Sequence, residues 1–143
     1  MAENKIIVNA PISVGELMDK ISILKIKKKN ITDEKKLLFI NEELQLLSST
    51  LNAVVQDNKI NEFLDKLIEV NSKLWKIEDD IRLCERNKKF NQHFIDLARE
   101  VYITNDKRTD IKLAINNHFG STLVEVKSYI KYWLIQTIEA WLN

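Results

Sequence analysis

The residues best suited to chemistry lie in Thr104–Arg108, where amide and charged side chains interrupt a run of apolar ones. Asn105 and Arg108 fall on the stripe that should face the protein core, and Asp106 lies between them. A buried polar group costs free energy unless it is hydrogen-bonded. The more common explanation is therefore a structural polar network or a local break in the helix. The alternative is a site that holds a charged ligand.

A second group of such residues follows Trp75 on what should be one helix face. Glu78 and Arg82 are four residues apart and Arg82 and Glu85 are three apart, so acid, base and acid lie side by side. Ordinary surface ion pairs explain such a pattern most often. The alternative is a cluster of carboxylates and a guanidinium that binds a charged molecule.

The third group, Asp19 and Lys20, flanks the buried stripe of the first predicted helix. Ordinary ion pairs at the flank explain such residues most often. The alternative is that these two side chains meet Arg108 or Asn105 across a helical bundle. In a site, the carboxylates would act as acid or base, and the arginine and lysine would hold an anion. No reaction follows from these residue types alone.

Motifs for familiar cofactors are missing from the sequence. There is no glycine-rich phosphate loop and no C-x-x-C, and neither His93 nor His118 has a partner at the spacing of helical metal ligands. The sequence therefore predicts no cofactor and no metal site, and it identifies no catalytic residue.

The composition limits the class of protein further. The 143 residues carry 22 basic and 21 acidic side chains, a formal net charge of +1, which does not favour nucleic acid as a partner. No stretch resembles a signal peptide or approaches the ~20 apolar residues of a membrane span. We therefore expect no membrane contact and a cytoplasmic location. Two glycines and one proline favour long helices over β-structure.

The first helix should begin at Ser13, because Ser13 and Glu16 match a capping box and Pro11 forces an extended chain before it. Residues 1–12 are thus expected to be an extended N-terminal segment. The helix should end on the basic run Lys25–Lys29, which complements the helix dipole.

Two long helices should follow, each with apolar residues at alternating spacings of three and four. One begins near Thr32 or Asp33 and runs to Val54, and the next runs from Ile60 to Cys84. Because only a short polar link joins them, we expect these two helices to pack as an antiparallel hairpin. Long apolar seams on a small domain also suggest a homodimer.

A fourth helix should begin at Asn91 and stop at Gly120. Thr122 and Glu125 match a second capping box, which predicts a C-terminal helix over 121–143. The predicted fold is a single all-α domain over 1–143, a bundle of about five helices with a long antiparallel helical hairpin.

Several stretches together resemble a bacterial family of short uncharacterised proteins. The pattern P-x-S-x-G-E-L-x-D-K-x-[TS]-I-L matches Pro11–Leu24, W-x-I-E-D-x-I-R-x-C-E matches Trp75–Glu85, T-N-D-x-R matches Thr104–Arg108 and K-S-Y matches Lys127–Tyr129. The resemblance covers about residues 6–130. It implies a helical family with no assigned activity, and its patterns coincide with the three polar groups.

Two functional hypotheses follow. The first is a non-catalytic helical binding or assembly module that forms a homo-oligomer. The second is a binding protein or enzyme that holds a small anionic ligand at a charged site inside the bundle. The candidate ligand-binding residues are those of the three polar groups: Asp19, Lys20, Trp75, Glu78, Arg82, Glu85, Asn105, Asp106 and Arg108.

Overall fold

The computed structural model describes residues 5–132, in which the chain forms four helices. These are α1 (Val14–Asn30), α2 (Glu34–Val54), α3 (Lys59–Arg86) and α4 (Gln92–Phe119). No strand occurs in residues 5–132. The predicted all-α class is therefore confirmed, with four helices in this part of the chain.

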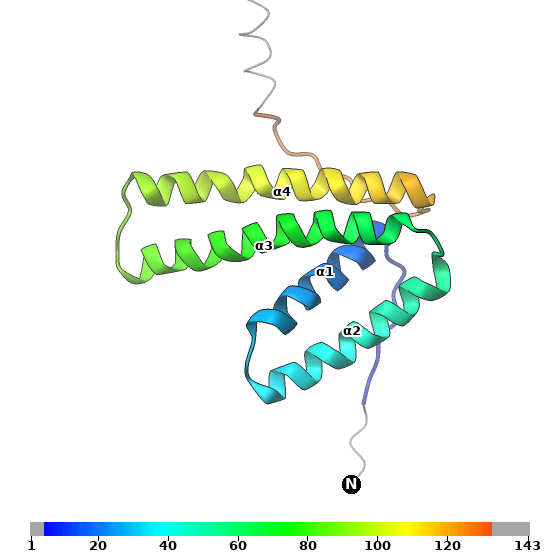
Figure 1. Ribbon diagram of the computed structural model, residues 1–143. Coiled ribbons are helices and arrows are strands. Elements are labelled where there is room, and N and C mark those ends of the chain that lie inside the picture. The colour runs from blue at the N-terminus through cyan, green and yellow to red at the C-terminus, as the bar shows by residue number, and fades with distance from the viewer. Residues whose placement is uncertain (1–4, 133–143) are drawn as a thin grey trace, which may run out of the picture.

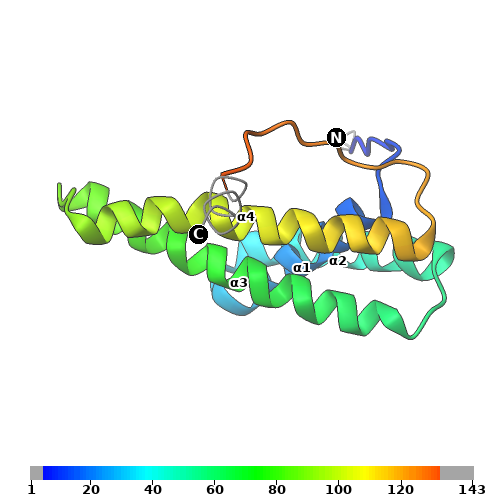
Figure 2. The same ribbon diagram turned by 90° about the horizontal axis from the view of Figure 1, so that it is seen from above.

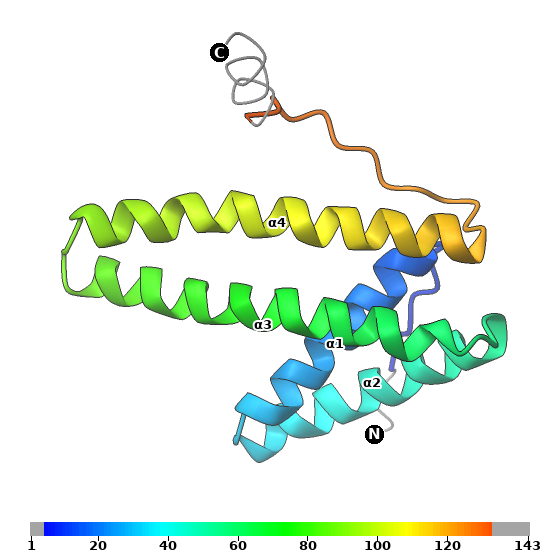
Figure 3. The ribbon, with the colours of Figure 1, turned by 45° about the horizontal axis from the view of Figure 1, so that its top comes forward.

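The helices form two antiparallel hairpins, and α1 packs at the contact between them (Figures 1 and 3). The longer hairpin is α3 with α4, and the shorter one is α1 with α2. α1 contacts all three other helices, and α2 makes its helix contacts with α1. The central position of α1 explains why so much of this helix is buried, including the polar side chains Asp19 and Ser22.

The expected hairpin between residues 32–54 and 60–84 is wrong, because the helices α2 and α3 do not pair with each other. α1 takes the place beside α3 that the seam of α2 was expected to fill. α2 covers the outer side of α1 and buries fully only Ile40 and Leu51 of its seam. The long antiparallel hairpin exists, but its partners are α3 and α4.

Side-chain caps fix three of the helix starts, as the sequence predicts. Ser13 Oγ accepts a hydrogen bond from the backbone N–H of Glu16 at 3.1 Å. Asp33 and Asn91 cap α2 and α4 in the same way. Glu16 itself pairs with a lysine of α4, so only one half of the predicted capping box is an internal helix contact.

The core has two parts. The larger cluster joins all four helices near the start of α1, and it consists of Leu17, Met18, Ile21, Leu51, Val55, Leu64, Leu67 and Ile115. A smaller cluster between α3 and α4 contains Ile77, Cys84 and Leu97. Cys84 is buried there, as expected for a cysteine on the apolar seam. The polar groups of interest lie between these two clusters.

α4 passes through Thr104–Arg108 without a break and ends at Gly120, whose left-handed conformation (φ 66°) matches the predicted stop. The predicted C-terminal helix does not form over residues 121–132, which are non-helical. Its proposed capping residue Glu125 binds Lys112 and Lys127, so its carboxylate is not available to cap a helix. Residues 133–143 lie outside the described part.

The C-terminal segment, residues 121–132, runs back along α4 toward the middle of that helix (Figure 2). At the other end of the chain, residues 5–12 of the expected extended segment are non-helical, and its residues 1–4 lie outside the described part. Among the described residues, no helix combines the length and the apolar character needed to cross a membrane.

Candidate functional site

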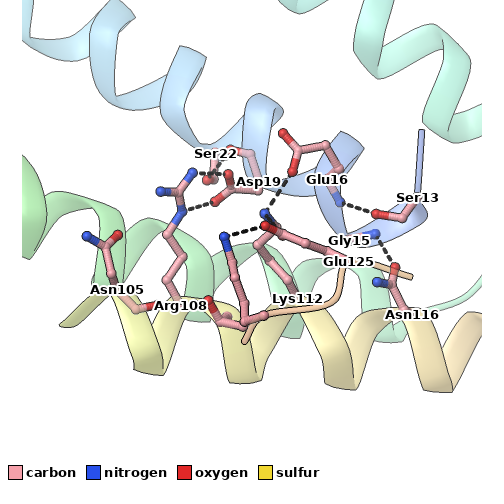
Figure 4. Close-up of polar contacts among 12 residues, drawn as sticks. Ser13, Gly15, Glu16, Asp19, Ser22, Asn105, Arg108, Lys112, Asn116 and Glu125 are labelled. Atoms are coloured by element: carbon pink, nitrogen blue, oxygen red, sulfur yellow. Dashed lines mark hydrogen bonds and ion pairs between the residues drawn. The ribbon is translucent and has the colours of Figure 1, made fainter. Parts of the chain in front are cut away.

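The centre of the candidate site is an ion pair between Asp19 of α1 and Arg108 of α4 (Figure 4). Arg108 Nε donates to Asp19 Oδ1 at 2.9 Å, and Nη2 donates to Asp19 Oδ2. Asp19 is fully buried, whereas 28% of the Arg108 side chain is exposed. Hydrogen bonding to the carboxylate raises the pKa of Arg108 although burial opposes this. The two-pronged contact fixes the guanidinium in one orientation.

Two further buried side chains complete this network. Asn71 of α3 donates from Nδ2 to Asp19 Oδ1 at 2.9 Å and to Ser22 Oγ at 2.8 Å. Ser22 Oγ donates to the carbonyl of Asp19 at 2.6 Å. α1, α3 and α4 therefore each contribute to the network around one carboxylate. The sequence analysis did not single out Asn71. The one feature that could have indicated its role is that this polar residue directly follows Val70, which lies on the apolar seam of the helix predicted from Ile60 to Cys84.

A second buried ion pair lies one turn along α4, at Lys112. Its Nζ is 2.7 Å from Glu16 Oε2 and 2.7 Å from Glu125 Oε2. Burial lowers the pKa of Lys112, but its hydrogen bonds to Glu125 and Glu16 outweigh this and leave the pKa raised. Lys112 and Lys127 lower the pKa of Glu125 to about 2. The sequence prediction missed Lys112, although its position four residues after Arg108 puts it on the same helix face.

α1 and α4 cross closely at Gly15. Its backbone N–H donates to Asn116 Oδ1 at 2.7 Å. A β-carbon at this position would lie 2.5 Å from the carbonyl oxygen of Lys112 and 2.9 Å from Asn116 Oδ1. Only glycine therefore allows the two backbones to approach this closely, and this approach helps bring Asp19 within reach of Arg108.

Arg108 and Asn105 border a cleft between α1, α3 and α4, which we call the Trp75 cleft. Its volume is about 400 Å³. Its wall combines apolar side chains, Trp75, two carboxylates and the donors of α4: Ile23, Ile26, Asn71, Leu74, Trp75, Glu78, Asp79, Asn105 and Arg108. Residues from the first and second polar groups of the sequence thus meet at one surface.

The same two residues, Asn105 and Arg108, also border a second cavity of about 540 Å³, which we call the Tyr129 cavity. It lies between α4 and the C-terminal segment. Tyr102, Asp106, Thr109 and Lys112 are among the residues that line its α4 side. Lys127, Tyr129 and Tyr132 contribute from the C-terminal segment. Arg108 therefore faces two cavities, one on each side of its position on α4.

Not all of the predicted site residues converge. Asp19 meets Arg108 across the bundle, which was the alternative to ion pairs at the flank. Trp75, Glu78, Asn105, Asp106 and Arg108 line one or both cavities. The others lie apart from the cavities. Lys20 is exposed on α1. Arg82 forms an exposed pair with Glu78, and Glu85 pairs with Lys88, which is the ordinary surface explanation of that pattern.

The chemistry available at the site is that of hydrogen bonding and charge. Among residues 5–132, no group of three or more His, Cys, Asp and Glu side chains is suited to hold a metal ion. Asp19 neutralises the charge of Arg108, and Glu16 and Glu125 surround that of Lys112. The exposed edge of the Arg108 guanidinium and the Asn105 amide remain at the surface of both cavities.

The comparisons with known proteins identify a family but no activity. Residues 8–137 match the model of a family described as a family of unknown function (DUF6165). No curated protein and no solved structure matches the chain. The family match spans the whole of the region that carries the ion pairs and both cavities. The chain belongs to this family of unknown function, DUF6165.

Proposed function

We propose that this protein is a non-catalytic binding module for a small organic molecule, and that the molecule binds in the Trp75 cleft. The observation that carries the proposal is the position of Arg108. A buried carboxylate holds its guanidinium rigidly, while one edge faces a cleft that also presents Trp75 and Asn105. Ligand sites of helical bundles are built in this way, from side chains on facing helices.

The surroundings of the acidic groups favour binding over catalysis. A carboxylate that acts as a general acid or base near neutral pH usually owes its raised pKa to burial. Asp79 is exposed, and 46% of the Glu78 side chain is exposed. Asp19 is buried, but Arg108 and Asn71 occupy its oxygens. The site therefore offers fixed donors and a shaped surface, and its acids are not placed for proton transfer.

A thermal-shift screen against charged metabolites tests this proposal. A ligand of the cleft should raise the melting temperature of the wild type but not that of Asn105→Ala or Trp75→Phe. These two substitutions avoid the buried ion pair, so both variants should fold. Glu85→Gln, on α3 but outside the cleft, is the matched control and should respond like the wild type. A ligand that stabilises all four proteins equally would contradict binding at this cleft.

A second proposal is assembly into a homodimer through α2. Phe39 and Leu46 are 74% and 48% exposed on this helix, and neighbouring Leu38 is 72% exposed. Phe39 and Leu46 are seven residues apart, so they lie on one face, as in the seam of a two-helix coiled coil. Sedimentation equilibrium of the full chain tests for the dimer.

A further inference from the structure

We infer that the ligand of the Trp75 cleft is an organic cation, such as an amine or amidinium with an apolar body and an oxygen acceptor at its other end. This inference rests on the proposed function, because it concerns the ligand of the same cleft. It differs from the expectation of an anionic ligand, which followed from the presence of Arg108 in the sequence. The charges around the cleft are what distinguish the two.

The first step concerns Arg108, whose positive charge is already compensated. The guanidinium forms two hydrogen bonds with the fully buried carboxylate of Asp19. Seen from the cleft, the pair is close to neutral, and its field falls off as that of a dipole. Arg108 therefore offers N–H donors to a ligand oxygen, but it does not supply a net positive charge that would select an anion.

The second step concerns the acidic side of the cleft, which is less well compensated. Glu78 and Asp79 both line the cleft. The nearest cation to Glu78 is Arg82, at 3.3 Å, but 77% of the Arg82 side chain is exposed. Such a pair contributes little and exchanges readily with another cation. Nearby Lys76 binds Asp80 at 2.8 Å and also attracts Asp79, so the three carboxylates Glu78, Asp79 and Asp80 share the two cations Lys76 and Arg82. The cleft therefore carries a negative potential at its Glu78–Asp79 end.

The third step concerns Trp75, which lies three and four residues before these acids and borders the same cleft. An indole face attracts a cation through its quadrupole, most strongly where water is partly excluded. Ile23, Ile26 and Leu74 supply apolar surface for a hydrocarbon body. A ring face with carboxylates beside it and an apolar wall suits an organic ammonium better than a metal ion or an inorganic anion.

The other end of the cleft sets the remaining feature of the ligand. Arg108 and Asn105 present N–H groups there, and these match a carbonyl, hydroxyl or carboxylate oxygen on the ligand. The volume of about 400 Å³ suits a compact molecule. The ligand class is thus a small molecule that is cationic at one end and accepts hydrogen bonds at the other.

The test addresses the cationic end of the ligand and compares three probes of similar size and different charge: phenethylamine, 2-phenylethanol and 3-phenylpropionate. Their binding is followed by the indole N–H signal of Trp75 in heteronuclear NMR, which Trp75→Phe assigns. We expect phenethylamine to shift this signal with a dissociation constant at least about tenfold lower than that of either other probe. We expect the double variant Glu78→Gln/Asp79→Asn to lose that preference and Glu85→Gln to retain it.

The outcomes separate this inference from the proposed function. If 3-phenylpropionate binds more tightly than phenethylamine, and Asn105→Ala weakens its binding, the ligand class is not cationic but the cleft remains a binding site. Equal binding of phenethylamine to the wild type and the double variant would also overturn the inference, as would the absence of any shift with millimolar phenethylamine. The proposed function fails separately, if no metabolite stabilises the protein in a manner that depends on Trp75 and Asn105.

Discussion

Asp19 and Arg108 form a buried ion pair whose two halves depend on each other. Removing one partner of such a pair leaves an uncompensated charge in a low-dielectric environment, which typically costs about 3–5 kcal/mol. Replacing both partners by neutral groups avoids that penalty. We therefore expect the pair to contribute less to net stability than to the register of α1 against α4.

This dependence predicts the behaviour of three variants. Arg108→Gln should lower the free energy of unfolding by about 3–5 kcal/mol, because Asp19 then stays buried without its counter-ion. Asp19→Asn/Arg108→Gln should be clearly more stable than Arg108→Gln. Urea denaturation of both variants and of Asp19→Asn measures the coupling. Additive effects of the two single substitutions would contradict a direct interaction between these side chains.

Thr104 presents the opposite case, a buried polar group without a counterpart. The residue is fully buried, and its Oγ1 has no hydrogen-bond partner among the described residues. Thr104→Val keeps the shape of the side chain and removes the unsatisfied hydroxyl, so we expect the protein to become more stable by about 1 kcal/mol. Chemical denaturation measures this. Thr109→Val is the control, because the Thr109 hydroxyl donates to the carbonyl of Asn105 at 3.1 Å and its removal should bring no gain.

Much of the residue-scale chemistry was predictable and some was not. Arg108 and Asn105 stood out because they interrupt an apolar stripe, and a partner across the bundle was one of the alternatives for Arg108. Asn71 and Lys112 did not stand out, because each lies beside an apolar stripe without interrupting it. Their role depends on which helices become neighbours, and local periodicity contains no such information.

At the scale of the helices, the crossing of α1 and α4 depends on Gly15. Gly15→Ala would place a methyl group 2.5 Å from the Lys112 carbonyl oxygen, which is backbone and cannot rotate away. We expect the steric clash to lower the free energy of unfolding by about 1–3 kcal/mol. The higher helix propensity of alanine over glycine offsets roughly 1 kcal/mol of this loss. Thermal unfolding measures it. Lys20→Ala, at an exposed position of the same helix, should be close to neutral, and an equal effect of both would contradict the close crossing.

Glu125 attaches the C-terminal segment to α4 through an ion pair with Lys112, which makes this contact sensitive to acid. Lys112 and Lys127 lower the pKa of Glu125 in the folded protein from 4.5 to about 2. A carboxyl group with a lowered pKa stabilises the fold fully above its ordinary value of 4.5, and this contribution is lost as the pH falls toward 2. The stability that depends on this segment should therefore decrease with acidification over that window.

An NMR titration of the Glu125 carboxyl carbon checks this prediction directly. The midpoint should lie near 2 in the wild type and should move toward 4.5 in Lys112→Met, since Lys112 contributes the largest effect. Lys127→Met should produce a smaller displacement. A wild-type midpoint near 4.5 would mean that the carboxylate does not contact these lysines in solution. The C-terminal segment would then lack its ion pair with Lys112 of α4.

At the scale of the whole molecule, helix positions were predictable but helix pairing was not. Ser13, Asp33, Asn91 and Gly120 indicated the boundaries correctly because capping is a local interaction. Which helices pair in the hairpins depends on which of several similar apolar helix faces packs against the same neighbouring helix. α1 is short, yet it occupies the centre because its buried face is the broadest. The helix predicted after Thr122 does not form over residues 121–132 for a related reason. Glu125 binds Lys112 of α4, which is distant in the sequence but close in space.

The peripheral position of α2 leads to the last prediction, which concerns assembly. α1 covers one side of α2, and the side that carries Phe39 and Leu46 is largely exposed. Two such helices packed antiparallel or parallel would bury four of these side chains, each of which contributes about 1.5–3 kcal/mol when fully buried. We expect the wild type to sediment as a dimer at micromolar concentration, and Phe39→Glu/Leu46→Glu to sediment as a monomer with an unchanged helical circular dichroism spectrum. Leu83→Glu is the matched control, because Leu83 is also exposed (53%) but lies on α3, so this variant should remain dimeric. A dimer that persists in the double variant would exclude α2 as the interface, and a monomeric wild type would leave the binding site within a single chain as the functional unit.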